Sequence, residues 1–422
     1  MRILVEQSGH PLMNLGDVSM LQVTVERLSR LWSNPYIEVL TSSPERLASF
    51  CPYAKPLSTI GQTFWHLPIL GKFHKLLPDP LANYWYETEW DLRHKFPHIF
   101  QKLIQLKLKN TPFYLNNINL FLEAIQKADL VVCSGGGYIT DEFPQNTSMA
   151  LGILGIANNL GKTTVMLGQG FGPLKNSRLR SQAKAVLPNV DLITLREKHA
   201  SLPLLTSLGV SHERVITTGD DSIELAYNLR PLELGYGIGI NLRMAKYASV
   251  SLDIFNTIRL AIQTVVKNKN IPAIPIPISE YDSDAETINQ LLIGLEKYTS
   301  QEQEQNNYLH TPEAIIKQVG KCRIVLTGSY HAGVFALAQG ISVVGLAQSQ
   351  YYVDKFLGLA DQFGHGCQVV FLNEDKLFEK LIDAINLCWE NSFVIREKLL
   401  ESAFNQIKLS YQEYEKIKDF FR

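Results

Sequence analysis

The chain has 422 residues, of which 45% are apolar and 19% are charged, and its formal net charge at pH 7 is −1. This length exceeds that of a usual single domain and predicts two domains of about 200 residues each. The nearly neutral charge gives no general case for nucleic-acid binding, so any anion site must depend on a few placed basic residues.

The chain has five cysteines and none of them forms a C-x-x-C pair: Cys51, Cys133, Cys322, Cys367 and Cys388. An odd, scattered set argues against a disulfide framework and favours a reducing compartment, so we expect a cytoplasmic protein. No apolar stretch reaches the roughly 18 residues that a membrane span needs, and we predict no transmembrane helix.

The first predicted strand is the apolar run 2–6, and a helix is predicted over 18–31. Asn14, Gly16 and Asp17 lie between them, where Gly16 would allow close backbone approach. The side chain of Asp17 either caps the helix, or it lies on the acceptor-substrate side of a site at the carboxyl end of the strand. A second strand is predicted at 37–40.

Residues 52–116 are rich in aromatic residues and prolines, and 62–110 hold seven Lys and Arg against four Asp and Glu. We interpret 52–116 as a mostly helical insertion that could cover an active-site cleft. Its aromatic and basic side chains could contact a sugar chain, a lipid-linked acceptor or a membrane surface, which would place the protein at the inner face of a membrane. The alternative is an ordinary helical subdomain that packs its aromatics inward.

Two glycine-rich loops follow predicted strands. The first comes after strand 130–133 and contains Gly135, Gly136, Gly137 and Asp141. The second comes after a helix at 147–160 and a strand at 163–167, and contains Gln169 and Gly170. Glycines at a strand end let backbone N–H groups face a ligand anion or hydroxyl, although a tight turn would explain the first loop equally well.

A strand at 191–195 ends in Arg196, and a further strand leads to Asp220. The alternation of strands and helices over 1–230 implies a doubly wound parallel sheet. Residues 231–422 predict a second domain of the same kind, in which a first strand ends at Arg243.

Near the end of the chain, Lys355 precedes a predicted turn at 357–359, and a last strand at 369–372 is followed by two helices. Two doubly wound, Rossmann-like domains that face each other across a cleft form a GT-B-like architecture.

The most informative stretch is 324–346, which reads as strand, small-residue loop, apolar helix and strand. His331 falls at the carboxyl end of the first of these strands, near a helix N-terminus. Open α/β sheets bind ligands at that edge, and free backbone N–H groups there favour an anion. The simpler interpretation is that His331 only hydrogen-bonds its own loop.

Six short motifs resemble those of the polysaccharide pyruvyl transferase family. They are Asn-x-Gly-Asp at 14–17, Gly-Gly-Gly-x-x-x-Asp at 135–141, Gly-Gln-Gly-Phe-Gly-Pro at 168–173, Arg-Glu at 196–197, Gly-Asp-Asp at 219–221 and Thr-Gly-Ser-Tyr-His-Ala at 327–332. Two positions depart from the family pattern: Ser329 stands where the family commonly has Arg, and Asp221 stands where it has Pro.

The resemblance implies transfer of a pyruvyl group from phosphoenolpyruvate to two hydroxyls of one sugar of a polysaccharide or glycan precursor, in the course of exopolysaccharide biosynthesis. His331 is then the general acid that protonates the enol carbon, with Asp17 as a second catalytic residue. We expect the donor's carboxylate and phosphate to bind at Arg196, Arg243, Ser329, Tyr330 and Lys355. We expect the acceptor, or the loops beside it, at Asn14, Gly16, Gly135, Gly136, Gly137, Asp141, Gln169 and Gly170.

No cofactor and no metal are expected, since no His, Cys and Asp cluster shows ligand spacing. Because Ser329 brings no charge, another cation such as Arg243, Arg323 or Lys355 must compensate, or the chain uses another donor or is an inactive glycan-binding member. The remaining alternative is a GT-B glycosyltransferase that uses a nucleotide sugar. The absence of an acid on the helix over 334–339, where many such enzymes bind ribose, counts against it.

Overall fold

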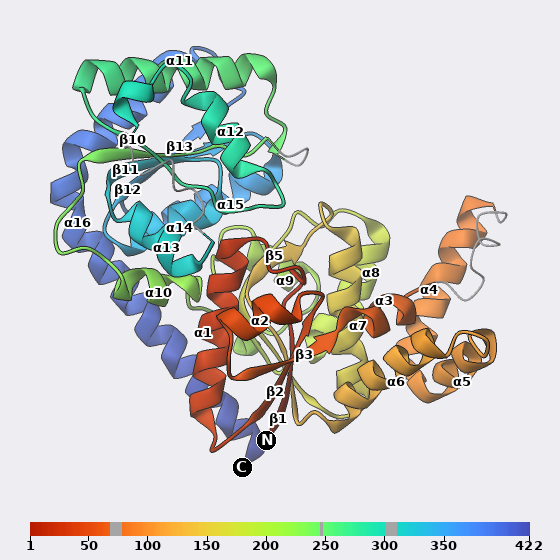
Figure 1. Ribbon diagram of the computed structural model, residues 1–422. Coiled ribbons are helices and arrows are strands. Elements are labelled where there is room, and N and C mark those ends of the chain that lie inside the picture. Colours follow the sequence, from red (N-terminus) through yellow and green to blue (C-terminus); the bar gives the residue numbers. More distant parts are fainter. Residues whose placement is uncertain (68–77, 245–247, 300–309) are drawn as a thin grey trace.

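The fold is built on two parallel β-sheets, one above the other in Figure 1. The computed structural model describes residues 1–67, 78–244, 248–299 and 310–422. The first sheet has the strand order β3-β2-β1-β4-β6-β7-β8, with β5 paired to β6, and the second has the order β10-β9-β11-β12-β13. Every pairing within the two sheets is parallel, as the alternation of predicted strands and helices implies.

The strands of the first sheet are β1 Arg2–Glu6, β2 Tyr36–Thr41, β3 Ala54–Ser58, β4 Leu130–Cys133, β5 Gly136–Ile139, β6 Thr163–Phe171, β7 Leu192–Leu195 and β8 Val215–Thr217. Its helices are α1 Leu15–Leu31, α2 Pro44–Phe50, α3 Thr59–Trp65, α4 Asp79–Lys95, α5 Pro97–Lys107, α6 Pro112–Lys127, α7 Pro144–Asn159, α8 Ser177–Val186, α9 Ser201–Ser207 and α10 Ser222–Asn228.

The second sheet consists of β9 Gly237–Asn241, β10 Ala273–Pro275, β11 Cys322–Thr327, β12 Ser342–Ala347 and β13 Cys367–Phe371. The helices of this half are α11 Leu252–Lys269, α12 Asp284–Leu291, α13 Pro312–Val319, α14 Tyr330–Ala338, α15 Gln350–Phe363 and α16 Leu377–Lys416.

Both faces of each sheet are buried. In β1, Ile3 and Val5 belong to one apolar cluster and Leu4 to the cluster on the opposite face. In β11, Val325 and Ile324 divide in the same way between two clusters. Helices cover both faces of such a sheet, which explains why its strands read as continuous apolar runs rather than as alternating ones.

Within the predicted insertion 52–116, residues 54–58 form β3 at the edge of the first sheet, because they pair with β2, and the rest of its described part is mainly helical. Helices α4, α5 and α6 project from the first half at the right of Figure 1. Residues 68–77, which fall within the predicted insertion, lie outside the described residues. None of the helices in the described ranges combines the length and the apolar character that crossing a bilayer demands.

The end of the chain returns to the first sheet. Helix α16 runs down the left side of Figure 1 from the second sheet to the first, so that the two termini lie near each other. Its residue Tyr414 joins the apolar cluster that contains Ile3 and Leu21. The long helix therefore ties the two halves together.

Several predicted elements differ from the structure. Part of the first predicted glycine-rich loop is strand β5, which pairs with β6. The predicted turn at 357–359 lies inside α15, where Gly358 leaves room for the side chain of Glu197. The strand predicted at 163–167 continues to Phe171, because β5 and β7 both pair with its second half. The two predicted terminal helices are one helix, α16, which contains no Gly or Pro to end it.

Candidate functional site

A cavity of about 290 Å³ lies between the two halves of the molecule. It is formed where strands of both sheets end, which is the edge at which open α/β sheets bind ligands. From the first half it is lined by Asn14, Asp17, Gly137 and Arg196, among others, and from the second half by Arg243, Ser329, Tyr330, His331, Tyr351 and Lys355.

Backbone hydrogen bonds hold the two halves together beside this cavity. The N–H of Leu15 donates to the carbonyl of Ile278 over 2.9 Å, and the N–H of Glu280 donates to the carbonyl of Met13 over 3.0 Å. On another side of the cavity, the hydroxyl of Tyr351 donates to the carbonyl of Gly137 over 3.0 Å. The cavity is therefore a joint product of both halves.

His331 lies in the first turn of α14 and is only 6% exposed. Its Nε2 atom has no hydrogen-bond partner among the described residues, and it is 3.7 Å from Oδ2 of Asp220. Gly16 makes this position possible, because a Cβ atom there would lie 2.1 Å from Cγ of His331. A glycine in the first half thus admits the imidazole from the second half.

Burial lowers the pKa of His331 well below its usual range, and the positive charges of Arg196, Lys355 and Arg243 add to this effect. The imidazole is therefore neutral at pH 7 in the free protein. A negatively charged ligand in the cavity would offset the positive charges and so raise the pKa.

Arg196 follows β7 and places a buried guanidinium at the cavity. Its Nε and Nη1 atoms have no hydrogen-bond partner in the described part of the chain, and Nη1 is 3.8 Å from Oδ2 of Asp220. The guanidinium lies 4.1 Å from the centre of the Tyr330 ring. Gly137 and Gly170 give it room, since a Cβ atom at either position would come within 2.6 Å of it.

Lys355 and Asp17 are two further charged groups that line the cavity. The ammonium of Lys355 donates to the Tyr351 hydroxyl, and burial together with the charge of Arg196 lowers its pKa well below the usual value. Burial raises the pKa of Asp17 to about 6, against the opposing influence of Lys355 and Arg196. Asp17 is thus a carboxylate at pH 7 that can take up a proton close to that pH.

Arg243 lines the cavity, but carboxylates already bind its guanidinium. Its Nε and Nη2 atoms donate to the two oxygens of Asp284 over 3.1 and 3.0 Å, and Asp282 lies 3.4 Å from Nη1. These two acids offset its charge, so Arg243 offers less to an anion than Arg196 does.

Ser329 is buried at the N-cap of α14. Its backbone N–H donates to Thr327 Oγ1 over 2.8 Å, and its side chain faces the same cavity. Arg323, one of the cations proposed to compensate for Ser329, lies at the other end of β11. Its Nε atom donates to Ser392 Oγ over 2.9 Å, and its guanidinium stacks on Trp389.

Several predicted site residues have structural contacts instead. Asp141 does not line the cavity: its carboxylate accepts hydrogen bonds from the N–H groups of Lys175 and Asn176. Gln169 is fully buried and donates to the carbonyls of Cys133 and Ser134.

The glycines of the first loop divide in a similar way. Gly135 and Gly136 make room for the side chains of Met20 and Tyr138, while Gly137 alone of the three lines the cavity.

Asn14, and not Asp17, is the N-cap of α1. Its Oδ1 atom accepts from the N–H groups of Gly16 and Asp17. This contact fixes the first turn of α1 and leaves the Asp17 side chain at the cavity.

Asp220 and Tyr351 are candidate site residues that the sequence analysis did not assign to the site. Asp220 is buried between His331 and Arg196, and Ser222 donates to its Oδ1 through both N–H and hydroxyl. The Gly-Asp-Asp motif at 219–221 was the signal for Asp220. For Tyr351 the sequence carries no comparable signal.

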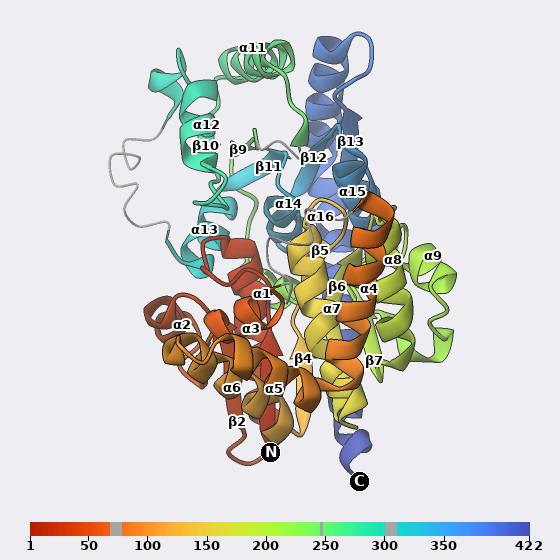
Figure 2. The ribbon, with the colours of Figure 1, turned by 90° about the vertical axis from the view of Figure 1, so that its right-hand side faces the viewer.

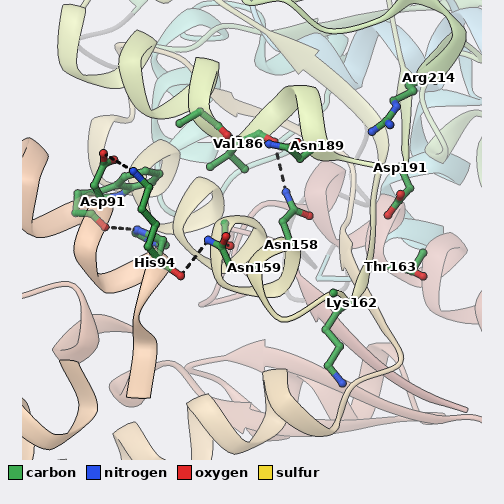
Figure 3. A pocket seen from close by; sticks show the side chains of 15 residues that line it. Asp91, His94, Asn158, Asn159, Lys162, Thr163, Val186, Asn189, Asp191 and Arg214 are labelled. Atoms are coloured by element: carbon green, nitrogen blue, oxygen red, sulfur yellow. Dashed lines mark hydrogen bonds and ion pairs between the residues drawn. The ribbon is translucent and has the colours of Figure 1, made fainter. Parts of the chain in front are cut away.

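A larger cavity, of about 650 Å³, lies at the opposite edge of the first sheet, near the start of β6 and β7 (Figure 3). Its lining includes His94, Asn158, Asn159 and Arg214. The side-chain amides of the two asparagines bind protein atoms: Asn159 donates to the carbonyl of His94, and Asn158 donates to the carbonyl of Val186. Among the described residues, none that lines this cavity also lines the cavity around His331.

Among solved structures, three with low sequence identity share the fold. A Listeria monocytogenes protein provisionally assigned as a UDP-N-acetylglucosamine 2-epimerase has a TM-score of 0.59 at 12% identity, with 100% of this chain and 96% of that chain covered. The Neisseria meningitidis UDP-GlcNAc 2-epimerase has 0.55 at 13% identity, with 99% and 100% covered. The S. aureus protein MnaA has 0.56 at 14% identity, with 100% and 96% covered. These similarities show the Rossmann-like GT-B fold, which confirms the fold prediction.

Comparison of the sequence with known families agrees with the six motifs. No curated protein sequence is significantly similar to the chain. The family model described as polysaccharide pyruvyl transferase, however, matches residues 14–350, which include all six motifs and every predicted site residue except Lys355. The chain therefore belongs to the polysaccharide pyruvyl transferase family.

Proposed function

We propose that this protein transfers the pyruvyl group of phosphoenolpyruvate to two hydroxyls of one sugar in a glycan, with His331 as the general acid. The observation that carries the proposal is that Nε2 of His331 and two guanidinium nitrogens of Arg196 have no hydrogen-bond partner among the described residues and lie near Lys355. Asp220 is the acid nearest to both, at 3.7 Å from His331 and 3.8 Å from Arg196. A proton-transfer group thus lies next to groups that bind anions.

The reaction needs both parts of this arrangement. His331 protonates the CH₂ carbon of the enol, which becomes a methyl group and leaves C2 with oxocarbenium character. One sugar hydroxyl bonds to C2 and loses its proton, the C2–O bond to phosphate breaks, and the second hydroxyl bonds to C2 and loses its proton. The products are a ketal and inorganic phosphate.

Asp17 has the properties of the base in this scheme. Its carboxyl has a pKa of about 6, so at pH 7 it is ionised but can accept a hydroxyl proton. Gly16, the residue before it, is in direct contact with His331, so the acid and the base act on one bound substrate pair.

The donor itself supplies the charge that His331 needs. The imidazole is neutral in the free protein, because it is buried among positive groups. A bound phosphate dianion places negative charge beside it, which favours the imidazolium form. His331 thus becomes the acid only when the donor is present.

Arg196, which belongs to the family's own Arg-Glu motif, is the cation that we propose holds the donor without the arginine that the family commonly has at position 329. It is buried and keeps two guanidinium nitrogens without hydrogen-bond partners in the described ranges. By contrast, Arg243 is engaged by Asp284 and Asp282, and Arg323 is engaged by Ser392.

Calorimetric titration with phosphoenolpyruvate, and separately with UDP-sugars, tests the donor. We expect phosphoenolpyruvate to bind and the His331→Ala variant to release phosphate about 10²–10⁴-fold more slowly in the presence of acceptor glycans. Unchanged turnover of His331→Ala would remove this residue from the mechanism. Binding of UDP-sugars alone would replace the proposal by a nucleotide-sugar glycosyltransferase, and binding of neither donor would favour a glycan-binding protein.

A further inference from the structure

The aromatic and aliphatic residues of the helical insertion divide between its two sides. Trp65, Trp90 and Phe100 are buried and join the apolar cluster under the first sheet. The inward-packing interpretation of the insertion accounts for these residues. It does not account for the outer side of α5, which also carries large apolar side chains.

The outer side of α5 forms an apolar stripe. Ile99, Leu103 and Leu106 are 59%, 46% and 72% exposed, and their spacing of four and three residues places them on one face of the helix. Phe96, just before α5, is 50% exposed, and Phe113 in the first turn of α6 is 60% exposed. We call these five residues the α5 stripe.

The charged side chains along α5 and the turn after it are all lysines. Residues 92–122 contain five Lys and Arg and no Asp or Glu, although Arg93 pairs with Glu89 and Lys95 with Asp91. Lys102, Lys107 and Lys109 are exposed. At about 100° per residue, Lys102 and Lys107 flank the stripe on its two sides. An apolar stripe between lysines is the pattern of helices that lie in a membrane interface.

We propose that the α5 stripe docks on a lipid bilayer that contains anionic lipids. The apolar side chains would enter the boundary between head groups and acyl chains, and the lysines would contact lipid phosphates. A second copy of this chain is a poorer occupant, because a two-fold contact through the stripe would bring the same lysines of both copies together.

The position of the stripe leaves the catalytic cavity accessible. In Figures 1 and 2, α5 and α6 lie on the side of the first sheet away from the second sheet, while the cavity lies between the two halves. Docking through α5 would therefore hold the protein at the membrane surface without covering the residues around His331.

Sedimentation of the full-length protein with vesicles tests the proposal. Vesicles of phosphatidylcholine alone are compared with vesicles that also contain phosphatidylglycerol. We expect binding to the mixed vesicles that weakens with added salt, and a partition coefficient that falls about five-fold or more for each of Lys102→Glu and Lys109→Glu. Leu106→Glu should lower it about ten-fold or more.

Matched controls lie on the other half of the molecule. Leu252→Glu changes a side chain of α11 that is as exposed as Leu106, and Lys317→Glu changes an exposed lysine of α13. Both should bind vesicles like the unchanged protein. All variants are surface changes, and circular dichroism with thermal melting checks their fold.

Three results would overturn the proposal. The first is no binding to either kind of vesicle, and the second is binding that the stripe variants do not weaken. The third is a dimer, detected by analytical ultracentrifugation, that Leu106→Glu dissociates, because a second copy would then cover the stripe. The measurement contains no phosphoenolpyruvate and no acceptor, so its failure leaves the proposed reaction untouched.

Discussion

At the scale of single residues, Arg196 and Arg323 make a matched pair. Both are arginines at or beside a strand end, but only Arg196 faces the cavity. Replacement of Arg196 by Gln removes the positively charged group that would hydrogen-bond the carboxylate or phosphate of phosphoenolpyruvate. We expect this to weaken phosphoenolpyruvate binding by about 1.5–3 kcal/mol in calorimetry. Arg323→Gln should leave the affinity as it is, and equal losses in the two variants would argue against an anion site at Arg196.

The protonation of His331 predicts how donor affinity depends on pH. The pKa of the free imidazole is lowered by burial and then by Arg196, Lys355 and Arg243, and the donor's negative charge raises it. Between these two pKa values the complex holds more protons than the free protein, so affinity should increase as the pH falls.

Calorimetry in buffers of different ionisation enthalpy measures this proton uptake directly. His331→Gln is the control, because it keeps a polar side chain that cannot titrate. The variant should take up roughly one proton less on binding at a pH between the two pKa values, and about half a proton less at the bound-state pKa. The same uptake in both proteins would show that another group, or the donor phosphate alone, is protonated.

Gly16 sets the position of His331 and gives a test of geometry rather than charge. A Cβ atom at residue 16 would lie 2.1 Å from Cγ of His331, so Gly16→Ala must displace the ring. We expect turnover to fall about 10²-fold, since a shift of about 1 Å in a reacting group has that effect. Gly333→Ala in α14 is the control, because the atom nearest to its Cβ would be the flexible tip of Leu359, at 3.1 Å, and its other neighbours would lie at ordinary contact distances of 3.6 Å or more.

The sequence was a good guide to site residues that follow strand ends and a poor one to those placed by packing. Asp17, Arg196 and His331 each follow a strand, and parallel sheets bring such ends to one edge, where the cavity contains all three. Asp141 also follows a glycine-rich loop, yet its carboxylate accepts backbone N–H groups before α8. A sequence pattern alone does not tell a carboxylate that lines the cavity, such as Asp17, from one that accepts backbone N–H groups, such as Asp141.

At the scale of elements, Arg27 joins three helices. Its Nε atom donates to Glu224 of α10 over 2.8 Å, and its Nη1 atom donates to Asp221 over 3.1 Å and to Ser410 of α16 over 2.6 Å. Asp221, where the family has Pro, also accepts from the hydroxyl of Tyr414 over 2.8 Å. This departure from the family pattern thus anchors the returning helix to the first half.

Arg27→Met should destabilise the protein by about 3–5 kcal/mol, because it leaves the buried Asp221 carboxylate without its charge partner. Arg30→Met is the matched control on the same helix, since Arg30 pairs with Glu26 in an exposed position and such pairs contribute about 0–1 kcal/mol. Urea unfolding followed by circular dichroism measures both. Similar midpoints for the two variants would contradict a tie through Arg27.

The predicted elements were most accurate where local signals act alone. Strands such as β1 and β4 were recognised as short apolar runs, whereas β3 and β5 were not predicted. The turn predicted at 357–359 was wrong because Gly358 serves the approach of Glu197 from the other half of the molecule. Contacts between distant segments leave no local pattern, so sequence alone could not predict them.

At the scale of the whole molecule, the cavity exists only while the two halves are in contact. Arg196, Asp17 and Asp220 come from the first half, and His331 and Lys355 come from the second. The backbone bonds from Leu15 to Ile278 and from Glu280 to Met13 lie at this junction. A donor that contacts groups from both halves should therefore hold them together, since it binds the closed arrangement best.

Hydrogen exchange measures this effect on both sides of the junction at once. We expect phosphoenolpyruvate to slow exchange of the Leu15 and Glu280 amides together, because both open when the halves separate. In His331→Ala the donor keeps Arg196 but loses a contact in the second half, so the slowing should be smaller. Slowing confined to one of the two amides would mean that the donor binds one half alone. The cavity between the halves would then serve the acceptor rather than the reacting pair.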